Sequence, residues 1–137
     1  MRLHDVLDLA VARRPGDPAI LVDGRTVTFA ELAGRVDALA RAVAATTPPG
    51  ARVAVLSENT LEFADAYYAI PRAGRVLVPL NYRLHPREWA GVIERTGATA
   101  IIGEAALLDA LEPHLPAGAR PAIVEIGPGA KIGRAHV

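Results

Sequence analysis

The chain of 137 residues contains no cysteine, a single lysine (Lys131) and a single serine (Ser57). The absence of cysteine excludes disulfides and thiolate metal ligands. No apolar run approaches the roughly 20 residues that a membrane-spanning helix needs, so we expect no membrane span. The first residues also lack the apolar stretch of a signal peptide. Together these absences predict a cytoplasmic protein.

The sequence also lacks the common phosphate-binding and metal-binding patterns. Neither G-x-G-x-x-G nor G-x-x-x-x-G-K-[ST] occurs. Acidic and basic residues number 15 each, and the resulting net charge of zero argues against a nucleic-acid partner. The four histidines share no metal-ligand spacing, so we expect no metal site in the chain. We expect His4 and His114 to lie on the surface and His85 to cap a helix.

Apolar residues make up 51% of the chain, and several short segments carry clear patterns for secondary structure. Apolar residues recur at helical spacing over residues 3–14, and proline and glycine follow at once. The dipeptide Asp23-Gly24 separates two short runs, residues 19–22 and 25–27, and is typical of a two-residue hairpin turn. The sequence therefore predicts a helix followed by a small hairpin.

A capping box marks the start of the next helix. Thr28 and Glu31 are three residues apart, a spacing at which each side chain satisfies the backbone N–H of the other residue. Apolar residues then line one helical face until the prolines and glycine of residues 46–50 end the helix. We therefore expect a long amphipathic helix from Thr28 to about residue 46.

The rest of the sequence alternates between strands and helices. Four runs are mostly apolar rather than alternating, which is typical of parallel strands covered by helices on both faces, and they span 52–56, 76–80, 99–102 and 122–126. Helical patterns lie between them, the first capped by Asn59. The predicted fold is α/β: a three-layer, doubly wound, mostly parallel sheet with a small N-terminal hairpin.

Two residues at predicted strand ends could carry chemistry. Ser57 lies where a nucleophile elbow would lie, but it lacks the G-x-S-x-G context, so we favour a structural role. Arg83 lies in the turn after the strand at 76–80, and ligands of open α/β sheets bind outside the carboxyl ends of strands. An arginine at that position can bind a phosphate or carboxylate with two parallel hydrogen bonds.

An ordered set of segments resembles the N-terminal domain of AMP-forming acyl-CoA synthetases. The set includes Asn81-Tyr82-Arg83-Leu84 at the end of a strand and Thr28-Phe29-Ala30-Glu31 at a helix start. The remaining matching segments are 50–56, 59, 62–63, 68, 70, 72–74, 78–80, 85–89 and 97–100. The resemblance departs at Arg75, where the family has a small or apolar residue, and we expect Arg75 at a strand edge.

The resemblance implies a two-step ligase. ATP and a carboxylic-acid substrate give an acyl-adenylate and pyrophosphate, and CoA then forms the thioester. It further implies that Arg83 contacts the phosphates of CoA, that the full-length enzyme uses ATP, CoA and Mg, and that a homo-oligomer is one option for that enzyme. The family's phosphate loop, adenylate motif, ribose-binding aspartate and catalytic lysine have no counterpart here. We therefore predict no catalytic residue, no tight cofactor binding and no activity in this chain alone.

The last residues of the chain differ in composition from the rest. Lys131 is the lone lysine among fourteen arginines, and residues 131–137 correspond to one reading frame of a common sequencing adapter. We therefore predict a partial ligase domain over residues 1–130 and a non-native tail over 131–137. Two alternatives stay open: part of an amino-acid adenylation domain of a peptide synthetase, and a complete non-catalytic α/β binding module.

Overall fold

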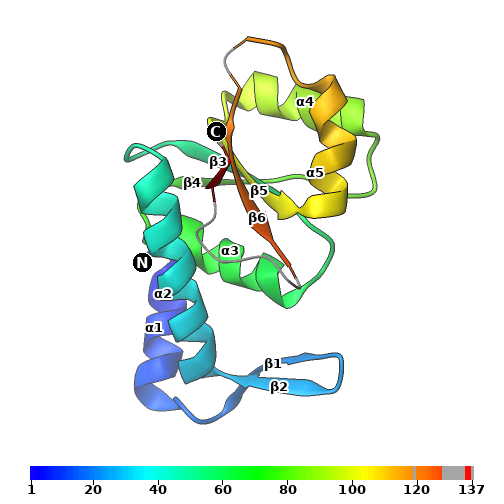
Figure 1. Ribbon diagram of the computed structural model, residues 1–137. Coiled ribbons are helices and arrows are strands. Elements are labelled where there is room, and N and C mark those ends of the chain that lie inside the picture. Colours follow the sequence, from blue (N-terminus) through cyan, green and yellow to red (C-terminus); the bar gives the residue numbers. More distant parts are fainter. Residues whose placement is uncertain (119, 128–134, 137) are drawn as a thin grey trace.

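The computed structural model describes residues 1–118 and 120–127 and the backbone of residues 135–136. Helices and strands alternate along most of this length (Figure 1). In chain order the elements are α1 (Leu3–Arg13), β1 (Pro18–Val22), β2 (Arg25–Thr28), α2 (Phe29–Thr46), β3 (Arg52–Leu56), α3 (Leu61–Arg72), β4 (Val76–Pro79), α4 (Pro86–Thr96), β5 (Ala100–Glu104), α5 (Ala105–Leu111), the 3-10 helix η1 (Glu112–His114), β6 (Ala122–Ile126) and β7 (Ala135–His136).

The main sheet has the strand order β4-β3-β5-β6-β7. The pairs β3–β4, β3–β5 and β5–β6 are parallel, and β7 is antiparallel to β6. Strands β1 and β2 form a separate antiparallel hairpin. The sequence prediction of an α/β fold with a mostly parallel sheet and an N-terminal hairpin is confirmed.

Helices cover both faces of this sheet (Figure 1). Because side chains alternate along a strand, Val53 and Val55 of β3 face the layer of α1, α2 and α3, whereas Ala54 and Leu56 face α4 and α5. Each face therefore has its own apolar cluster, and the predicted three-layer arrangement is confirmed.

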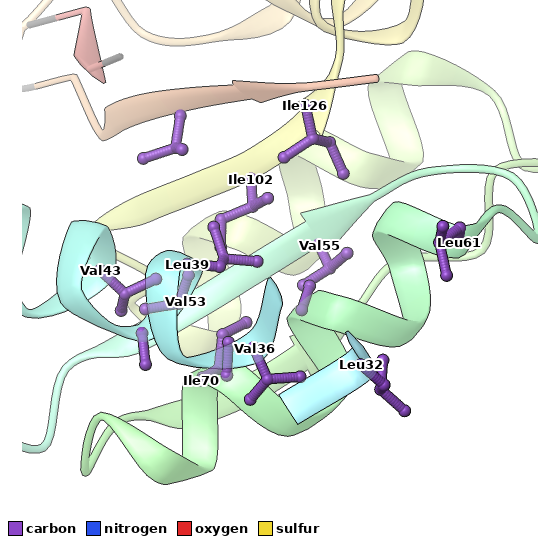
Figure 2. Packing of buried hydrophobic residues seen from close by; sticks show 14 of the residues in the cluster. Leu32, Val36, Leu39, Val43, Val53, Val55, Leu61, Ile70, Ile102 and Ile126 are labelled. Atoms are coloured by element: carbon purple, nitrogen blue, oxygen red, sulfur yellow. The ribbon is translucent and has the colours of Figure 1, made fainter. Parts of the chain in front are cut away.

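The larger cluster lies between the sheet and the first three helices (Figure 2). Val36 and Leu39 of α2, Ile70 of α3 and Ile102 of β5 meet there, and none of them is more than 2% exposed. Burying one such side chain contributes about 1.5–3 kcal/mol to folding. This layer therefore supplies much of the apolar burial that holds the sheet in place.

The local signals at the hairpin and at α2 have the geometry that the sequence predicts. Asp23 and Gly24 both have positive φ angles, of 49° and 71°, as a two-residue hairpin turn requires. The backbone N–H of Glu31 donates to Thr28 Oγ1 at 3.1 Å, and the backbone N–H of Thr28 donates to Glu31 Oε1 at 3.4 Å. The capping box is thus complete.

Three details differ from the prediction. Strand β4 is an edge of the sheet and is only partly buried: Leu77 packs on one face and Val78 on the other, so the cover expected on both faces is incomplete for this strand. Strand β5 continues to Glu104, because Gly103 and Glu104 still pair with β6. The cap of α3 is Thr60 rather than Asn59, since the Thr60 side chain accepts the backbone N–H of Phe63.

Candidate functional site

The carboxyl ends of the four parallel strands lie along one edge of the sheet. The strands end at Leu56 (β3), Pro79 (β4), Glu104 (β5) and Ile126 (β6). The chain leaves β3 toward β4 on one side and leaves β5 toward β6 on the other, so the topological switch point lies between β3 and β5. Ligands of doubly wound sheets bind in the crevice at such a point.

Side chains at the ends of β3 and β5 contact each other across this switch point. Glu104 Oε2 accepts the backbone N–H of Glu58 at 2.8 Å and the Ser57 hydroxyl at 3.3 Å. The Ser57 hydroxyl also lies 3.0 Å from Thr60 Oγ1, and Ser57 is only 2% exposed. We call these four residues, Ser57, Glu58, Thr60 and Glu104, the Ser57–Glu104 clasp. The clasp ties the loop after β3 to the end of β5, and the structural role predicted for Ser57 is confirmed.

A second feature of the same edge is the turn after β4, residues 81–84. The Asn81 side-chain Oδ1 accepts the backbone N–H of Arg83 at 3.0 Å, and the Asn81 carbonyl accepts the N–H of Leu84 at 3.1 Å. The buried indole of Trp89 donates to the same carbonyl at 2.7 Å. Asparagine therefore shapes the 81–84 turn, and Trp89 fixes it to helix α4.

This turn leaves the Arg83 side chain exposed to solvent. Its Nε donates to Tyr82 Oη at 3.3 Å, and its guanidinium carbon lies 5.6 Å from the centroid of the Tyr82 ring. Such a cation–π contact orients a guanidinium without using all of its donors. No carboxylate within the described residues forms an ion pair with Arg83. The guanidinium therefore keeps donors available for an anion.

The charges along the edge differ from one strand end to the next. At the switch point between β3 and β5 lies the Glu104 carboxylate, and Glu58 is exposed beside it. The β4 end instead presents Arg83. Because like charges repel and unlike charges attract, an anion is disfavoured at the switch point and favoured at the 81–84 turn. The turn is therefore the candidate ligand contact on this edge.

The histidines divide into different roles. His85 caps α4, as the sequence predicts, with its Nδ1 accepting the N–H of Arg87 at 3.0 Å. His114 is exposed, as expected, but the surface position expected for His4 is wrong, since His4 is 6% exposed on the inner side of α1. Among the described residues, no three His, Cys, Asp or Glu side chains are grouped to hold a metal ion. The side chain of His136 lies outside the described residues.

None of the helices described is long and apolar enough to cross a membrane. The tail predicted over residues 131–137 lies outside the described residues, apart from the backbone of Ala135–His136, and its origin stays a prediction.

The fold and this edge define a doubly wound α/β domain with an exposed arginine, Arg83, in the turn that follows β4. A family model described as "AMP-binding enzyme" matches residues 7–134. The chain belongs to this family of adenylate-forming enzymes.

Curated relatives come from two branches of such enzymes. The chain is 32% identical over 114 residues to a fatty acid–[acyl-carrier-protein] ligase, ScoC, of Streptomyces coeruleorubidus, covering 82% of this chain and 22% of that protein. It is 28% identical to a 3-oxocholest-4-en-26-oate–CoA ligase of Rhodococcus rhodochrous, over 85% of this chain and 21% of that ligase. A nonribosomal peptide synthetase of Aspergillus fumigatus is 34% identical over 90% of this chain and 1% of its own length. The chain thus spans about a fifth of the length of the two ligases.

Solved structures share the fold. The N-terminal subdomain of NpsA from Klebsiella oxytoca, in complex with 3-hydroxyanthranilyl-AMSN, matches with a TM-score of 0.77 and 26% identity, over 90% of this chain and 30% of that one. A benzoate CoA ligase from Burkholderia xenovorans matches with a TM-score of 0.85, over 97% of this chain and 27% of that one. At 22% identity the second likeness bears on the fold alone.

Proposed function

We propose that the chain is the N-terminal part of an ATP-dependent acyl-CoA ligase, in which Arg83 contacts a phosphate of CoA. The observation that carries this proposal is the exposed Arg83 guanidinium, which the 81–84 turn presents at the carboxyl edge without a carboxylate partner among the described residues. Arginine is suited to phosphate because its planar group donates two parallel hydrogen bonds.

In this proposal the rest of the enzyme supplies the chemistry. The chain has one lysine and one serine, and it contains no glycine-rich phosphate loop of the G-x-x-x-x-G-K-[ST] type. The residues that hold ATP and Mg and bind the carboxylic acid would then belong to sequence beyond this chain. The role of the chain is to build the sheet and to present Arg83 to the acyl acceptor.

A second candidate function is part of an amino-acid adenylation domain. The 34% identity to the Aspergillus fumigatus peptide synthetase over 126 residues favours it. The two candidates differ in the acyl acceptor. Free CoA carries a nucleotide with a 3′-phosphate, whereas a carrier protein presents phosphopantetheine without the nucleotide. Only the first acceptor offers Arg83 the nucleotide phosphates.

The test follows the Arg83 Nε–Hε signal of the purified chain by NMR while CoA or pantetheine is added. We expect CoA to shift this signal and pantetheine, which carries no phosphate, to leave it in place at the same concentration. An equal response to both compounds, or no response to either, would contradict the role of Arg83. The variant Arg41→Gln, which removes an exposed arginine of α2, controls for non-specific attraction.

A further inference from the structure

The N-cap of helix α4 is a histidine whose acceptor atom is itself titratable. His85 Nδ1 accepts the backbone N–H of Arg87 at 3.0 Å, and the backbone N–H of His85 donates to Glu88 Oε2 at 2.8 Å. An imidazole nitrogen accepts a hydrogen bond only when it carries no proton. The cap therefore requires the neutral ring with its proton on Nε2.

A second imidazole lies against this cap. The ring of His114, in η1, packs edge-to-face on His85, with the two centroids 5.5 Å apart and the planes at 81°. When both rings are protonated they repel each other. A proton on His85 Nδ1 would therefore both remove the capping acceptor and place a charge against the His114 ring.

The helix start is joined to the 81–84 turn. Trp89, one turn into α4, donates its indole N–H to the Asn81 carbonyl at 2.7 Å, and Arg83 lies two residues before His85. A change in the first turn of α4 thus acts directly on the segment that holds Arg83 in place.

We propose that His85 is a proton-operated cap, which on protonation releases the N-terminus of α4 and loosens the 81–84 turn. Histidine is the side chain whose charge ordinarily changes between pH 5 and 8, and a protonated Nδ1 repels the N–H that it accepts in the neutral form. Threonine, which caps α2 and α3 in this chain, has no such dependence. Acid therefore acts on α4 and leaves the two threonine-capped helices, α2 and α3, unchanged.

Other charged groups lie near this cap. Arg83 and Arg87 flank His85 in the sequence, and Glu88 Oε2 accepts the His85 backbone N–H. The packed neighbours η1 and α5 carry Glu112 and Asp109, and Glu112 is already paired with Arg120 at 3.1 Å. The release depends on the loss of an acceptor atom, which none of these charges restores.

The test is an NMR titration of the 137-residue chain from pH 8 to pH 5. At pH 8 we expect the His85 ring to carry its proton on Nε2. As the ring protonates, the protection of the Arg87 amide against solvent exchange, corrected for the intrinsic pH dependence, falls about fivefold, which corresponds to the loss of a typical N-cap. The Trp89 indole signal moves with it.

Two variants and two internal controls make the result decisive. His85→Asn keeps a capping acceptor that does not titrate, so Arg87 protection stays high and flat, whereas His85→Ala lowers it at every pH. The amides of Glu31 and Phe63, capped by Thr28 and Thr60, stay unchanged over the range. Protonation of His85 without loss of Arg87 protection, an equal loss in His85→Asn, or a ring with its proton on Nδ1 at pH 8 overturns the proposal.

Discussion

Arg75 and Thr47 are 28 residues apart in sequence, and Arg75 Nε donates to Thr47 Oγ1 at 2.9 Å. The Arg75 guanidinium also donates to the backbone carbonyls of Thr47 and Ala44, and of Ala73 just before β4. The last carbonyls of a helix have no partner within the helix. Arg75, which directly precedes the edge strand β4, thus caps the C-terminus of α2 with its side chain.

This contact predicts the effect of removing the guanidinium. Arg75→Met keeps an apolar stem and leaves the carbonyl of the buried Thr47 without its charged donor, so we expect a loss of about 2 kcal/mol in the free energy of unfolding. Urea unfolding followed by circular dichroism measures it. Arg41→Met, on the exposed side of α2, is the matched control and should change stability by less than about 0.5 kcal/mol. Equal effects of the two substitutions would contradict the closing role of Arg75.

Gly103 of β5 lies opposite Leu56 of β3, where there is no room for a side chain. A Cβ at this position would lie 2.9 Å from the Leu56 carbonyl oxygen and 2.9 Å from Leu108 Cδ2. Gly103→Ala should therefore cost about 1–3 kcal/mol through overpacking. Gly34→Ala, in the middle of α2 with nothing within 4 Å, should instead stabilise the chain by about 0.5–1 kcal/mol. Thermal melts of the two variants test the pair, and a neutral Gly103→Ala would contradict the close approach.

Asp65 of α3 gives the chain a pH-dependent stability. Asp65 is 3% exposed, and burial raises the pKa of its carboxyl above the ordinary 3.8, although Arg35 opposes this with a hydrogen bond of 2.8 Å. An acid whose folded pKa is raised binds its proton more tightly in the folded state. The contribution of Asp65 to the free energy of unfolding is therefore fully present below pH 3.8. It is lost as the pH rises through the pKa of Asp65 in the folded state.

The variant Asp65→Asn removes this dependence. Wild type should lose stability relative to Asp65→Asn as the pH rises from about 3.5, measured by urea unfolding at a series of pH values. Asp109→Asn, which changes an exposed aspartate of α5, should run parallel to wild type. If instead wild type becomes more stable relative to Asp65→Asn as the pH rises, the contact with Arg35, rather than burial, determines the direction of the Asp65 pKa shift.

The next prediction concerns the ligase activity of the chain alone. The purified chain should release no pyrophosphate from ATP in an acid-dependent manner, because we propose that the residues for adenylation lie outside it. A coupled pyrophosphate assay with and without a panel of carboxylic acids measures this. Pyrophosphate release that rises with the concentration of the acid and stops when the acid is omitted would contradict the proposal that the residues for adenylation lie outside the chain.

Features set by neighbouring residues were predictable from the sequence. The Asp23-Gly24 turn and the box of Thr28 and Glu31 depend on residues at most three positions apart, so their pattern is readable directly. The cap of α3 was missed because Asn59 and Thr60 are adjacent and both have capping side chains. The family resemblance supplied the candidate at Arg83, which residue pattern alone favoured only weakly.

Features that depend on strand order or distant contacts were not predictable. The clasp joins Ser57 to Glu104, 47 residues away, and no local pattern links them. The partial exposure of β4 follows from its place at the sheet edge, because the chain crosses β3 to reach β5. His4 is buried because α1 packs against both α2 and α3, so that more of its surface is covered than its own apolar pattern indicates.

Binding of adenosine 3′,5′-bisphosphate tests whether Arg83 contacts a phosphate. In an NMR titration of the 137-residue chain, we expect saturable shifts centred on the 81–84 turn. Arg83→Gln should raise the dissociation constant about tenfold, in line with the loss of a charge-assisted hydrogen bond. Arg41→Gln should bind as wild type does. An unchanged dissociation constant in Arg83→Gln, or an equal loss in both variants, would contradict the claim.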